Sequence, residues 1–489
     1  MLIEKLLASA DRVPDRIAAE DPTRGLSYAN LVRLADVLRR RVERETRLDR
    51  VGIMLPSSVG FVGTLFGVLW AGRTAIPINF LLQPAELAGI VTDSGIDLVI
   101  AIRHFATLLA PLPVRSVFLD ELPMRRAMVL ERLRRRPAAP RVSPDDLAVI
   151  LYTSGTSAQP KGVCLTQRNL AFDVDGCIAA AKLQAEHRFL GLLPLFHTFG
   201  LTALLLVPIA LGATTYYLPR FSPHTVLQTV REQRLSVMMA VASVYQALVR
   251  QRSAAPADLA SLEYLISGGE PLSDTVYAAM AERFGKTLVQ GYGLTETSPV
   301  VSLDLPWSHR RGTVGRAIPG VEVTSHDDGG AALPAGDVGE LYVRGPNVMR
   351  GYYKRPDETA AVMTSDGWFK TGDMGRIDGD GYIAITGRKK EMIIVGGENV
   401  YPREIEGALE EHPAVAEAAV LGQMDASRGE VVVAFVSPRE GASVAEIELR
   451  EHCRARLAAY KVPRRVIVQA DLPRGPTGKL FKRKLRELL

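Results

Sequence analysis

Hydrophobic and polar residues alternate with two different periods along the first 140 positions of the chain. Apolar residues at helical spacing predict helices at 28–42, 59–71 and 84–94. Short β-rich runs predict strands between these helices, at 51–55, 74–78 and 98–102. Strands that alternate with helices are typical of βαβ units, so we expect a mostly parallel sheet.

A second α/β stretch is predicted after a charged, proline-bearing segment at 122–144, which we interpret as a surface connection. The stretch begins with a strand at 147–152 and continues through an apolar segment at 201–218. Further strands are predicted at 236–241, 264–267 and 287–290. The last two end in glycine-rich loops, and ligand-binding loops of α/β sheets lie at such carboxyl ends.

The texture of the sequence changes twice more towards the end of the chain. From about Gly312, short strands with frequent Gly, Pro and Asp predict a small β subdomain. The last hundred residues predict a compact α+β module, with a helix that starts near Pro402, strands at 415–421 and 431–437 and a helix at 444–457. The predicted fold class is therefore α/β, with a large N-terminal domain of two α/β subdomains and a small β subdomain, and a small α+β C-terminal domain.

Composition and charge narrow the classes of protein. The chain has 489 residues, of which 47% are hydrophobic and 23% charged, as in globular proteins of more than one domain. The net charge of +5 is modest, and we interpret the run 132–136 as a solvated helix face, so no nucleic-acid partner is expected. The apolar stretches at 59–72 and 201–213 are shorter than the roughly 20 residues that a membrane-spanning helix needs. We expect at most peripheral membrane contact.

The cysteines and the N-terminal segment favour a reducing compartment. Cys164, Cys177 and Cys453 are widely separated and form no Cys/His cluster, which argues against a disulfide framework and a zinc site. The opening MLIEKLLASADRVPDR has charges in its first turns and lacks the apolar core of a signal peptide. We therefore expect a cytoplasmic protein.

A loop rich in Gly, Ser and Thr, from Tyr152 to Gly162, follows the strand at 147–152. Backbone N–H groups, hydroxyls and a lysine are what a phosphate chain needs at close range. The loop lacks the Gly-Lys-Ser/Thr of a Walker P-loop, so an ordinary P-loop NTPase is not expected. A phosphate-binding loop is the prediction, and a plain connection is the alternative.

Two further glycine-rich loops, at 267–272 and 290–297, each follow a predicted strand. Their glycines allow the backbone to approach a flat ring, on which Tyr292 offers a stacking face. The Glu296 carboxylate supplies a hard oxygen ligand for Mg²⁺. Tight turns are the alternative for each glycine pair taken alone.

Charged residues mark two more motifs. The segments 368–373 and 387–390 offer a carboxylate and a guanidinium, which suit a ribose diol and a phosphate. The segment 472–480 holds a lysine in a Pro/Gly turn near the C-terminus, where a solvated tail is the alternative.

Together and in this order, these motifs resemble the acyl-adenylate-forming superfamily, which includes acyl-CoA synthetases, firefly luciferase and the adenylation domains of peptide synthetases. The resemblance covers nearly the whole chain. It implies a ligase that uses ATP and Mg²⁺ to convert a carboxylic acid to acyl-AMP, releases pyrophosphate, and then transfers the acyl group to coenzyme A. It also implies a monomer or a homodimer.

The resemblance assigns roles residue by residue. The implied nucleotide site comprises Thr153, Ser154, Gly155, Thr156, Lys161, Gly268, Gly269, Glu270, Pro271, Gly291, Tyr292, Gly293, Thr295, Asp373 and Arg388. Thr156 and Glu296 would lie near the Mg²⁺. Lys479 would bridge the substrate carboxylate and the α-phosphate, so the implied catalytic residues are Lys479, Thr156, Glu296 and His197.

The resemblance further implies a mobile C-terminal domain. Lys390 matches a hinge between a large domain at 1–389 and a small domain at 390–489. Gly396, Gly397 and Glu398 would line the pantetheine tunnel during thioester formation. Ala158 and Ala242 depart from the family pattern, which has Gly and Pro at these positions, and neither departure removes a charged group.

The acyl pocket of the family corresponds here to 194–200 and 241–245. The first segment has no Asp for an amino-acid substrate, and 190–218 has no Lys or Arg for a dicarboxylate. His197 resembles a movable gate of the family, with a satisfied core histidine as the alternative. We interpret the small residues Gly200, Ala203, Ala210, Gly212 and Ala213 as room for an acyl chain.

A medium- or long-chain fatty acid is therefore the predicted substrate, and an aryl acid is the alternative. The alternative acceptor is the phosphopantetheine of an acyl carrier protein. A non-catalytic acyl-nucleotide sensor is not favoured, because such a protein is expected to have lost Lys479 or Glu296, and both are present.

Overall fold

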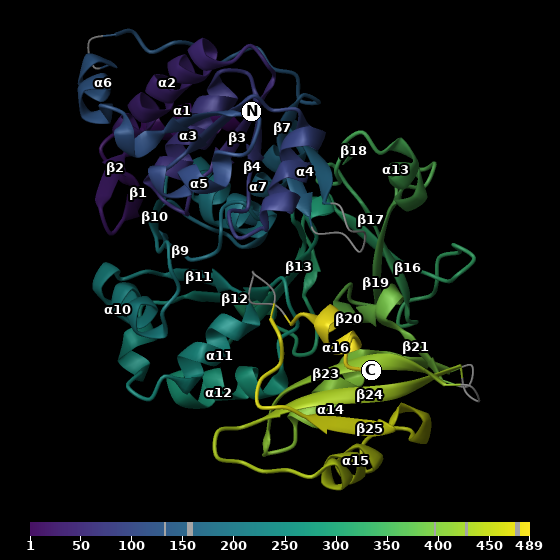
Figure 1. The fold of residues 1–489 in the computed structure, drawn as a ribbon. Helices are drawn as coiled ribbons and strands as arrows, with labels where there is room; N and C mark the ends of the chain where they lie inside the picture. Colours follow the sequence, from purple (N-terminus) through teal and green to yellow (C-terminus); the bar gives the residue numbers. More distant parts are fainter. Residues whose placement is uncertain (132–133, 154–159, 396–397, 426–428, 475–479) are drawn as a thin grey trace.

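The computed structural model of the chain describes residues 1–131, 134–153, 160–395, 398–425, 429–474 and 480–489. In these residues the strands form four sheets. Two large sheets with their helices build the upper and left parts of the molecule in Figure 1, and two smaller sheets lie at the right and below. The predicted α/β class with a separate C-terminal module is confirmed.

The first large sheet has the strand order β18-β8-β7-β4-β3-β5-β6. Its strands are β3 (Arg50–Met54), β4 (Thr74–Pro77), β5 (Leu98–Ala101), β6 (Arg115–Phe118), β7 (Leu147–Thr153), β8 (Lys161–Thr166) and β18 (Gly351–Tyr352). The strands from β7 to β6 run parallel, whereas β8 pairs antiparallel with β7 and β18 pairs antiparallel with β8. The predicted parallel sheet is therefore confirmed for the part built by βαβ units.

Two helices of this first part show how small residues determine helix packing. Helix α3 (Val59–Trp70) is buried along its whole length, and the Ser58 side chain caps its first turn by accepting from the Phe61 N–H. A Cβ at Gly63 would lie 2.4 Å from the Leu34 side chain of α2 (Tyr28–Glu45). The glycines therefore let α2 and α3 pack closely over the sheet.

The second large sheet has the strand order β15-β14-β13-β12-β11-β9-β10-β1-β2. Its strands are β1 (Ile17–Asp21), β2 (Arg24–Ser27), β9 (Arg188–Gly191), β10 (Thr214–Tyr217), β11 (Val237–Ala240), β12 (Tyr264–Gly268), β13 (Val289–Gly293), β14 (Val300–Leu303) and β15 (Arg316–Ala317). The hairpin β1-β2 comes from the start of the chain but pairs with β10. The second sheet therefore contains strands from both the start and the middle of the chain, and the two large sheets do not divide the sequence into two successive halves.

One sequence interpretation needs correction. The segment 122–144 is not only a surface connection, because it contains helix α6 (Met124–Glu131), whose Met124 and Met128 pack against the core.

The apolar segment at 201–218 holds several elements. Helix α8 (Thr198–Leu201), a π-helical turn at Thr202–Leu206 and α9 (Val207–Leu211) are followed by strand β10. Gly212, with φ of 79°, ends the helix in the left-handed conformation.

The small β subdomain has the strand order β16-β17-β19-β20. Its strands are β16 (Glu322–His326), β17 (Gly339–Arg344), β19 (Phe369–Ile377) and β20 (Ile383–Arg388), and helix α13 (Pro356–Val362) follows β18 nearby. Neighbouring strands are antiparallel throughout. This confirms the small β subdomain that was predicted from about Gly312.

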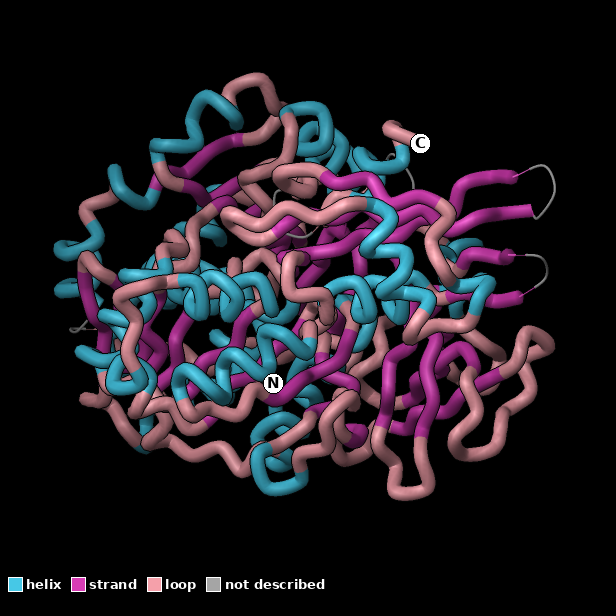
Figure 2. The backbone as a smooth tube through the Cα atoms, turned by 90° about the horizontal axis from the view of Figure 1, so that it is seen from below, coloured by secondary structure: helices cyan, strands magenta, loops and turns pink. Residues whose placement is uncertain are grey.

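The C-terminal module combines β21 (Ile393–Val395), β22 (Glu398–Val400), β23 (Val415–Asp425), β24 (Gly429–Pro438) and β25 (Arg465–Val468) with α14 (Pro402–Glu410), α15 (Glu446–Arg454) and α16 (Lys482–Arg486). The order is β22-β21-β24-β23, and β25 pairs with β24 in parallel. Figure 2 shows strands β21 to β24 extending together to one edge of the molecule. The predicted α+β module is confirmed.

The C-terminal module packs beneath the second sheet, beside α11 (Ala242–Arg250) and α12 (Asp274–Phe284) (Figure 1). The Gln246 amide donates to the Ala416 carbonyl at 3.4 Å, and the Thr275 hydroxyl donates to the Glu410 carbonyl at 3.2 Å. Within the residues described, no helix is both long enough and apolar enough to cross a membrane.

Candidate active site

The hairpin of β7 and β8 fixes both ends of the predicted phosphate loop. Thr153 and Lys161 are opposite each other in the antiparallel register of this hairpin. The Tyr353 N–H donates to the Gly162 carbonyl at 2.7 Å and thereby attaches β8 to the segment after β18. The loop residues Ser154, Gly155, Thr156 and Ala158 lie outside the described residues.

The two other glycine-rich motifs are brought side by side by the parallel pairing of β12 and β13. Gly268 is opposite Gly291 in this pairing. A Cβ at Gly293 would lie 1.7 Å from the Pro299 carbonyl oxygen, and a Cβ at Gly268 would lie 3.1 Å from the Phe199 ring. Gly268, Gly291 and Gly293 belong to the strands themselves, so the predicted strand ends of 267 and 290 are too early.

Glu270 has a structural contact that the sequence did not indicate. Its carboxylate accepts a hydrogen bond from the Ser243 N–H at 2.5 Å, in the first turn of α11. A carboxylate at a helix N-terminus stabilises the unpaired N–H groups there. Glu270 therefore joins the loop after β12 to the helix that starts with Ala242, while Gly269 and Pro271 beside it are exposed.

Tyr292, Asp373 and Arg388 form a connected cluster from three strands, β13, β19 and β20. The Tyr292 hydroxyl donates to Asp373 Oδ2 at 2.8 Å, and Arg388 Nε lies 2.9 Å from Asp373 Oδ1. The Asp373 side chain is 5% exposed, whereas the Arg388 side chain is 60% exposed. The carboxylate is therefore held at the bottom of the cluster and the guanidinium at its rim.

Burial and neighbouring charges shift the pKa values of both Asp373 and Tyr292. Burial raises the pKa of Asp373, and the Arg388 guanidinium and the Tyr292 hydroxyl oppose this shift. Burial and the neighbouring Asp373 charge raise the pKa of Tyr292 well above its usual value. Tyr292 thus remains a neutral donor, and its hydrogen bond fixes the orientation of the ring.

Glu296 lies in the short 3₁₀ turn Thr295–Thr297, directly after β13. Its Oε1 accepts a hydrogen bond from the Tyr352 hydroxyl at 2.9 Å, and Lys161 Nζ lies 5.4 Å from the centre of the same tyrosine ring. Tyr352 belongs to β18, which pairs with β8. The structure therefore connects the end of the phosphate loop with the predicted metal ligand through one tyrosine.

This arrangement fits a magnesium ion that is held with a bound nucleotide. Among the described residues, no group of three or more His, Cys, Asp or Glu side chains could hold a metal ion. Mg²⁺ usually binds through one or two carboxylates together with substrate phosphates and water, and Glu296 supplies one carboxylate beside the phosphate loop. The second predicted metal ligand, Thr156, lies outside the described residues.

The segment around Lys390 is fastened on both sides. Lys389 Nζ lies 3.0 Å from carboxylate oxygens of both Asp328 and Glu340, on the small β subdomain side. Glu391 Oε2 lies 2.9 Å from Lys482 Nζ in the C-terminal module. Lys390 itself is exposed between these two attachments. The ion pairs on its two sides therefore belong to different parts of the molecule.

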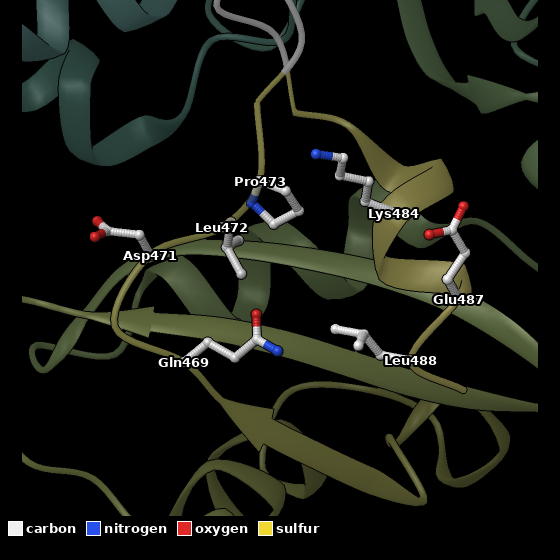
Figure 3. A pocket seen from close by; sticks show the side chains of 7 residues that line it. All are labelled: Gln469, Asp471, Leu472, Pro473, Lys484, Glu487 and Leu488. Atoms are coloured by element: carbon white, nitrogen blue, oxygen red, sulfur yellow. The ribbon is translucent and has the colours of Figure 1, made fainter.

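The remaining predicted residues of the C-terminal module are only partly described. Glu398 is exposed at the start of β22, while Gly396, Gly397 and Lys479 lie outside the described residues. Figure 3 shows a pocket of about 450 Å³ on this module; its lining residues are Gln469, Asp471, Leu472, Pro473, Lys484, Glu487 and Leu488. Leu472 and Pro473 belong to the predicted 472–480 motif, but none of the lining residues is one of the predicted site residues.

The segment predicted to form the acyl pocket is tightly packed in places. His197 is exposed at the N-cap position of α8, with its ring centre 4.9 Å from that of Phe196. A Cβ at Gly200 would lie 2.3 Å from the Pro194 carbonyl oxygen, and one at Gly212 would lie 2.9 Å from the Arg12 side chain. The interpretation that small residues leave room for a substrate is therefore wrong at Gly200 and Gly212, where glycine permits close packing.

Sequence reasoning missed Tyr352, Glu358, Lys389 and Glu391. Tyr352 and Glu358 approach Lys161 only because β18 pairs with β8, and nothing in the local sequence indicates a pairing across nearly two hundred residues. Lys389 and Glu391 flank Lys390 in the sequence, but their partners Glu340 and Lys482 lie on other elements.

Comparison with known proteins agrees with this geometry. Residues 6–353 match the family described as AMP-binding enzyme, and residues 404–479 match the AMP-binding enzyme C-terminal domain. A feruloyl-CoA synthase from Amycolatopsis is 36% identical over 480 residues, which cover 97% of this chain and 96% of that protein. A long-chain-fatty-acid–CoA ligase from Bacillus subtilis is 33% identical over 531 residues, which cover 99% and 93%.

Solved structures share the whole fold. ATP-bound MatB from Rhodopseudomonas palustris is 31% identical to this chain, with a TM-score of 0.92. Apo MatB from the same organism is 32% identical, with a TM-score of 0.83. Each comparison covers 100% of this chain and 98% of the MatB chain. The anthranilate CoA ligase AuaEII in complex with anthranoyl-AMP is 26% identical with a TM-score of 0.92, covering 100% and 96%. The chain belongs to the AMP-binding family of the acyl-adenylate-forming superfamily and is an AMP-forming acyl-CoA ligase.

Proposed function

We propose that this ligase activates a medium- or long-chain fatty acid, with the nucleotide bound between the glycine-rich strands β12 and β13 and the small β subdomain. The observation that carries the proposal is the convergence of Lys161, Glu296, Tyr292, Asp373 and Arg388 from distant parts of the chain. Adenine stacks on the Tyr292 face, the ribose hydroxyls donate to Asp373, and Arg388 and Lys161 bind phosphate oxygens.

In the first half-reaction, a carboxylate oxygen of the acid attacks the α-phosphorus of ATP. The bond from this phosphorus to the bridging oxygen breaks, and pyrophosphate leaves with the electron pair. Lys161 stabilises the charge that develops on the leaving group, and Lys479 bridges the acid and the α-phosphate. Mg²⁺, held by Glu296 and Thr156, neutralises phosphate charge when it is bound.

In the second half-reaction, the C-terminal domain at 390–489 turns about Lys390 relative to the large domain at 1–389. The thiolate of coenzyme A attacks the acyl carbonyl carbon, and AMP leaves. Gly396, Gly397 and Glu398 line the tunnel for the pantetheine arm. The ion pairs on either side of Lys390 support this division, because Lys389 and Glu391 are attached to different domains.

An apolar acid is supported by the walls of the predicted pocket. The segment 190–218 carries no Lys or Arg that could pair with a second carboxylate, and Phe199 lies against Gly268 at the border of the nucleotide slot. An aryl acid is the second candidate, since the relatives include a feruloyl-CoA synthase as well as a fatty-acid ligase. His197 serves as the gate of this pocket in either case.

Coenzyme A is the acceptor in this proposal, and an acyl carrier protein is the alternative acceptor. The proposal further includes a monomer or homodimer in the cytoplasm. Free Cys164, Cys177 and Cys453, all buried, are compatible with a reducing compartment.

One assay tests substrate and acceptor together. Pyrophosphate release is measured with fatty acids of increasing length and with aryl acids, each with and without coenzyme A. We expect the highest kcat/KM with a medium- or long-chain fatty acid, and acceleration by coenzyme A. A preference for ferulate-like acids would favour the second candidate. Acyl-AMP formation without acceleration by coenzyme A would contradict the proposed acceptor.

A further inference from the structure

The lysine at the end of the phosphate loop already has a carboxylate partner. Lys161 Nζ contacts Glu358 Oε2, and Glu358 lies on α13, outside every predicted motif. We propose that Glu358 is a counter-ion that holds Lys161 while no nucleotide is bound, and that it competes with the phosphates of ATP for this lysine. The proposal rests on the proposed nucleotide site and adds a residue that determines its affinity.

The backbone geometry keeps the two partners within reach of each other. Helix α13 follows β18, where Tyr352 is opposite Val163 of β8. The Tyr352 N–H donates to the Thr359 hydroxyl at 2.9 Å, which ties the helix to the strand. Because both backbones are fixed, only the flexible lysine side chain has to move when it exchanges the carboxylate for a phosphate.

Glu358 has a second cation that remains when the lysine leaves. Arg355 Nη1 lies 2.9 Å from Glu358 Oε1, and Arg355 precedes Glu358 by about one helical turn. Hydrogen bonds from Lys161 and Arg355 hold the pKa of Glu358 below its usual value, so the carboxylate is charged at neutral pH. When Lys161 leaves, Glu358 therefore still pairs with Arg355, and the free-energy cost of breaking the Lys161–Glu358 pair is small.

Exposure also suits an exchangeable pair. The Lys161 side chain is 24% exposed and the Glu358 side chain 34% exposed. Ion pairs at such sites are weak because water solvates both partners, whereas a bound triphosphate carries several negative charges. ATP can thus displace Glu358 from Lys161, but breaking this ion pair makes the binding free energy of ATP less favourable.

Tyr352 explains why the lysine pairs with Glu358 and not with the predicted metal ligand. Its ring lies 5.4 Å from Lys161 Nζ, and its hydroxyl donates to Glu296 at 2.9 Å. The two carboxylates are therefore kept apart: Glu296 is held by a neutral hydroxyl, and Glu358 is paired with cations.

The test measures the binding of ATP alone by calorimetry, with Mg²⁺ and without acid or coenzyme A. Glu358→Gln should lower the Kd for ATP about five-fold, because the competitor for Lys161 is gone. Arg355→Gln should raise the Kd about three- to five-fold, because Glu358 then pairs with Lys161 alone. A merely structural role would shift both variants in the same direction.

Two further variants separate the counter-ion role from a general effect of surface charge. The double variant Glu358→Gln with Arg355→Gln should bind ATP like Glu358→Gln alone, since Arg355 acts only through Glu358. Glu322→Gln, which removes another exposed carboxylate paired with an arginine, Arg344, should leave the Kd unchanged. Unfolding temperatures near that of the wild type show that each variant is folded.

Weaker ATP binding by Glu358→Gln, or a double variant that binds as poorly as Arg355→Gln, would overturn the counter-ion role alone. Failure of the wild-type enzyme to bind ATP would overturn the proposed nucleotide site together with it. The two failures are therefore distinguishable.

Discussion

Tyr292, Asp373 and Arg388 illustrate at the residue scale how three strands build one candidate ribose site. The buried carboxylate is oriented by the neutral Tyr292 hydroxyl and by the Arg388 guanidinium at the rim, which together set the direction of its remaining acceptor positions. Glu296 is held in a similar way by Tyr352. Both acidic residues are thus positioned by side chains that come from other elements.

Glu296→Gln tests the metal assignment at this scale. The substitution removes the hard anionic ligand but keeps an acceptor for Tyr352, so we expect Mg²⁺-dependent acyl-AMP formation to fall about a hundredfold or more, on the order of 2.7 kcal/mol of barrier. Pyrophosphate release is measured as a function of Mg²⁺ concentration, with Glu322→Gln as the matched control. Unchanged turnover with an unchanged metal dependence would contradict the assignment.

Residues in short motifs could be predicted, and residues that act across the fold could not. Asp373, Arg388, Tyr292 and Glu296 were identified by their motifs, and the structure brings them near one another. Glu358 carries no motif, and its contact with Lys161 depends on the register of β18 against β8. Glu270 was predicted at the adenine slot, and its contact with the first turn of α11 depends on the end of β12.

At the scale of elements, α14 joins the C-terminal module to α12. The Thr275 hydroxyl donates to the Glu410 carbonyl at the end of α14, and burial lowers the pKa of Arg403 in its first turn. Burial raises the pKa of Glu410 to about 8, while the hydrogen bond from the Ala418 N–H opposes this shift. This helix therefore carries ionisable groups in surroundings with little water.

The variant Glu410→Gln tests whether the raised pKa of Glu410 makes the stability of the protein depend on pH. Because the pKa of Glu410 is higher in the folded state than in the unfolded state, the contribution of this carboxyl group to stability is fully present below the unfolded pKa and is lost as pH rises through about 8. The variant stays neutral, so its unfolding temperature should exceed that of the wild type by an amount that grows between pH 5 and pH 8, on the order of 3 °C.

The control for this prediction is Glu411→Gln, which changes the exposed neighbour that pairs with Arg456. Thermal unfolding followed by circular dichroism at several pH values gives the difference directly. Parallel curves for the wild type and Glu410→Gln across this pH range would show that Glu410 does not titrate as its surroundings predict.

Elements with a strong period were predicted within a few residues, and elements set by tertiary contacts were not. The helices at 59–70 and 84–94 and the strands β3, β4, β5 and β7 of the first sheet follow their hydrophobic patterns, whereas β6, β8 and β18 were not predicted. The hairpin β1-β2 is short and partly polar, so only its pairing with β10 makes it a strand. Helix α6 lies in a charged segment in which two partly buried methionines, Met124 and Met128, make too short a pattern to show a period.

At the scale of the whole molecule, the C-terminal module packs against α11 and α12. Such an arrangement could not be predicted from the sequence, because a hinge permits several positions and only contacts such as that of Gln246 with Ala416 select one.

Lys390→Pro tests the proposed hinge. Proline fixes φ at this position, so domain rotation should stop while acyl-AMP formation remains near normal and thioester formation falls by about a hundredfold or more. Lys390→Ala is the matched control, because it removes the side chain but leaves the backbone free. Equal losses in both half-reactions would instead indicate misfolding or a hinge elsewhere.

The most direct test of the two-step account concerns Lys479, whose role follows from the family resemblance. Lys479→Ala should reduce acyl-AMP formation by roughly 10² to 10⁴, because the charge that bridges carboxylate and α-phosphate is lost. Supplied with synthetic acyl-AMP and coenzyme A, the same variant should form thioester at close to the wild-type rate, and Lys484→Ala should affect neither step. The measurement is the loss in the first half-reaction divided by the loss in the second. A ratio far above one is predicted, and a ratio near one in a folded variant would contradict both the role of the lysine and the domain rotation.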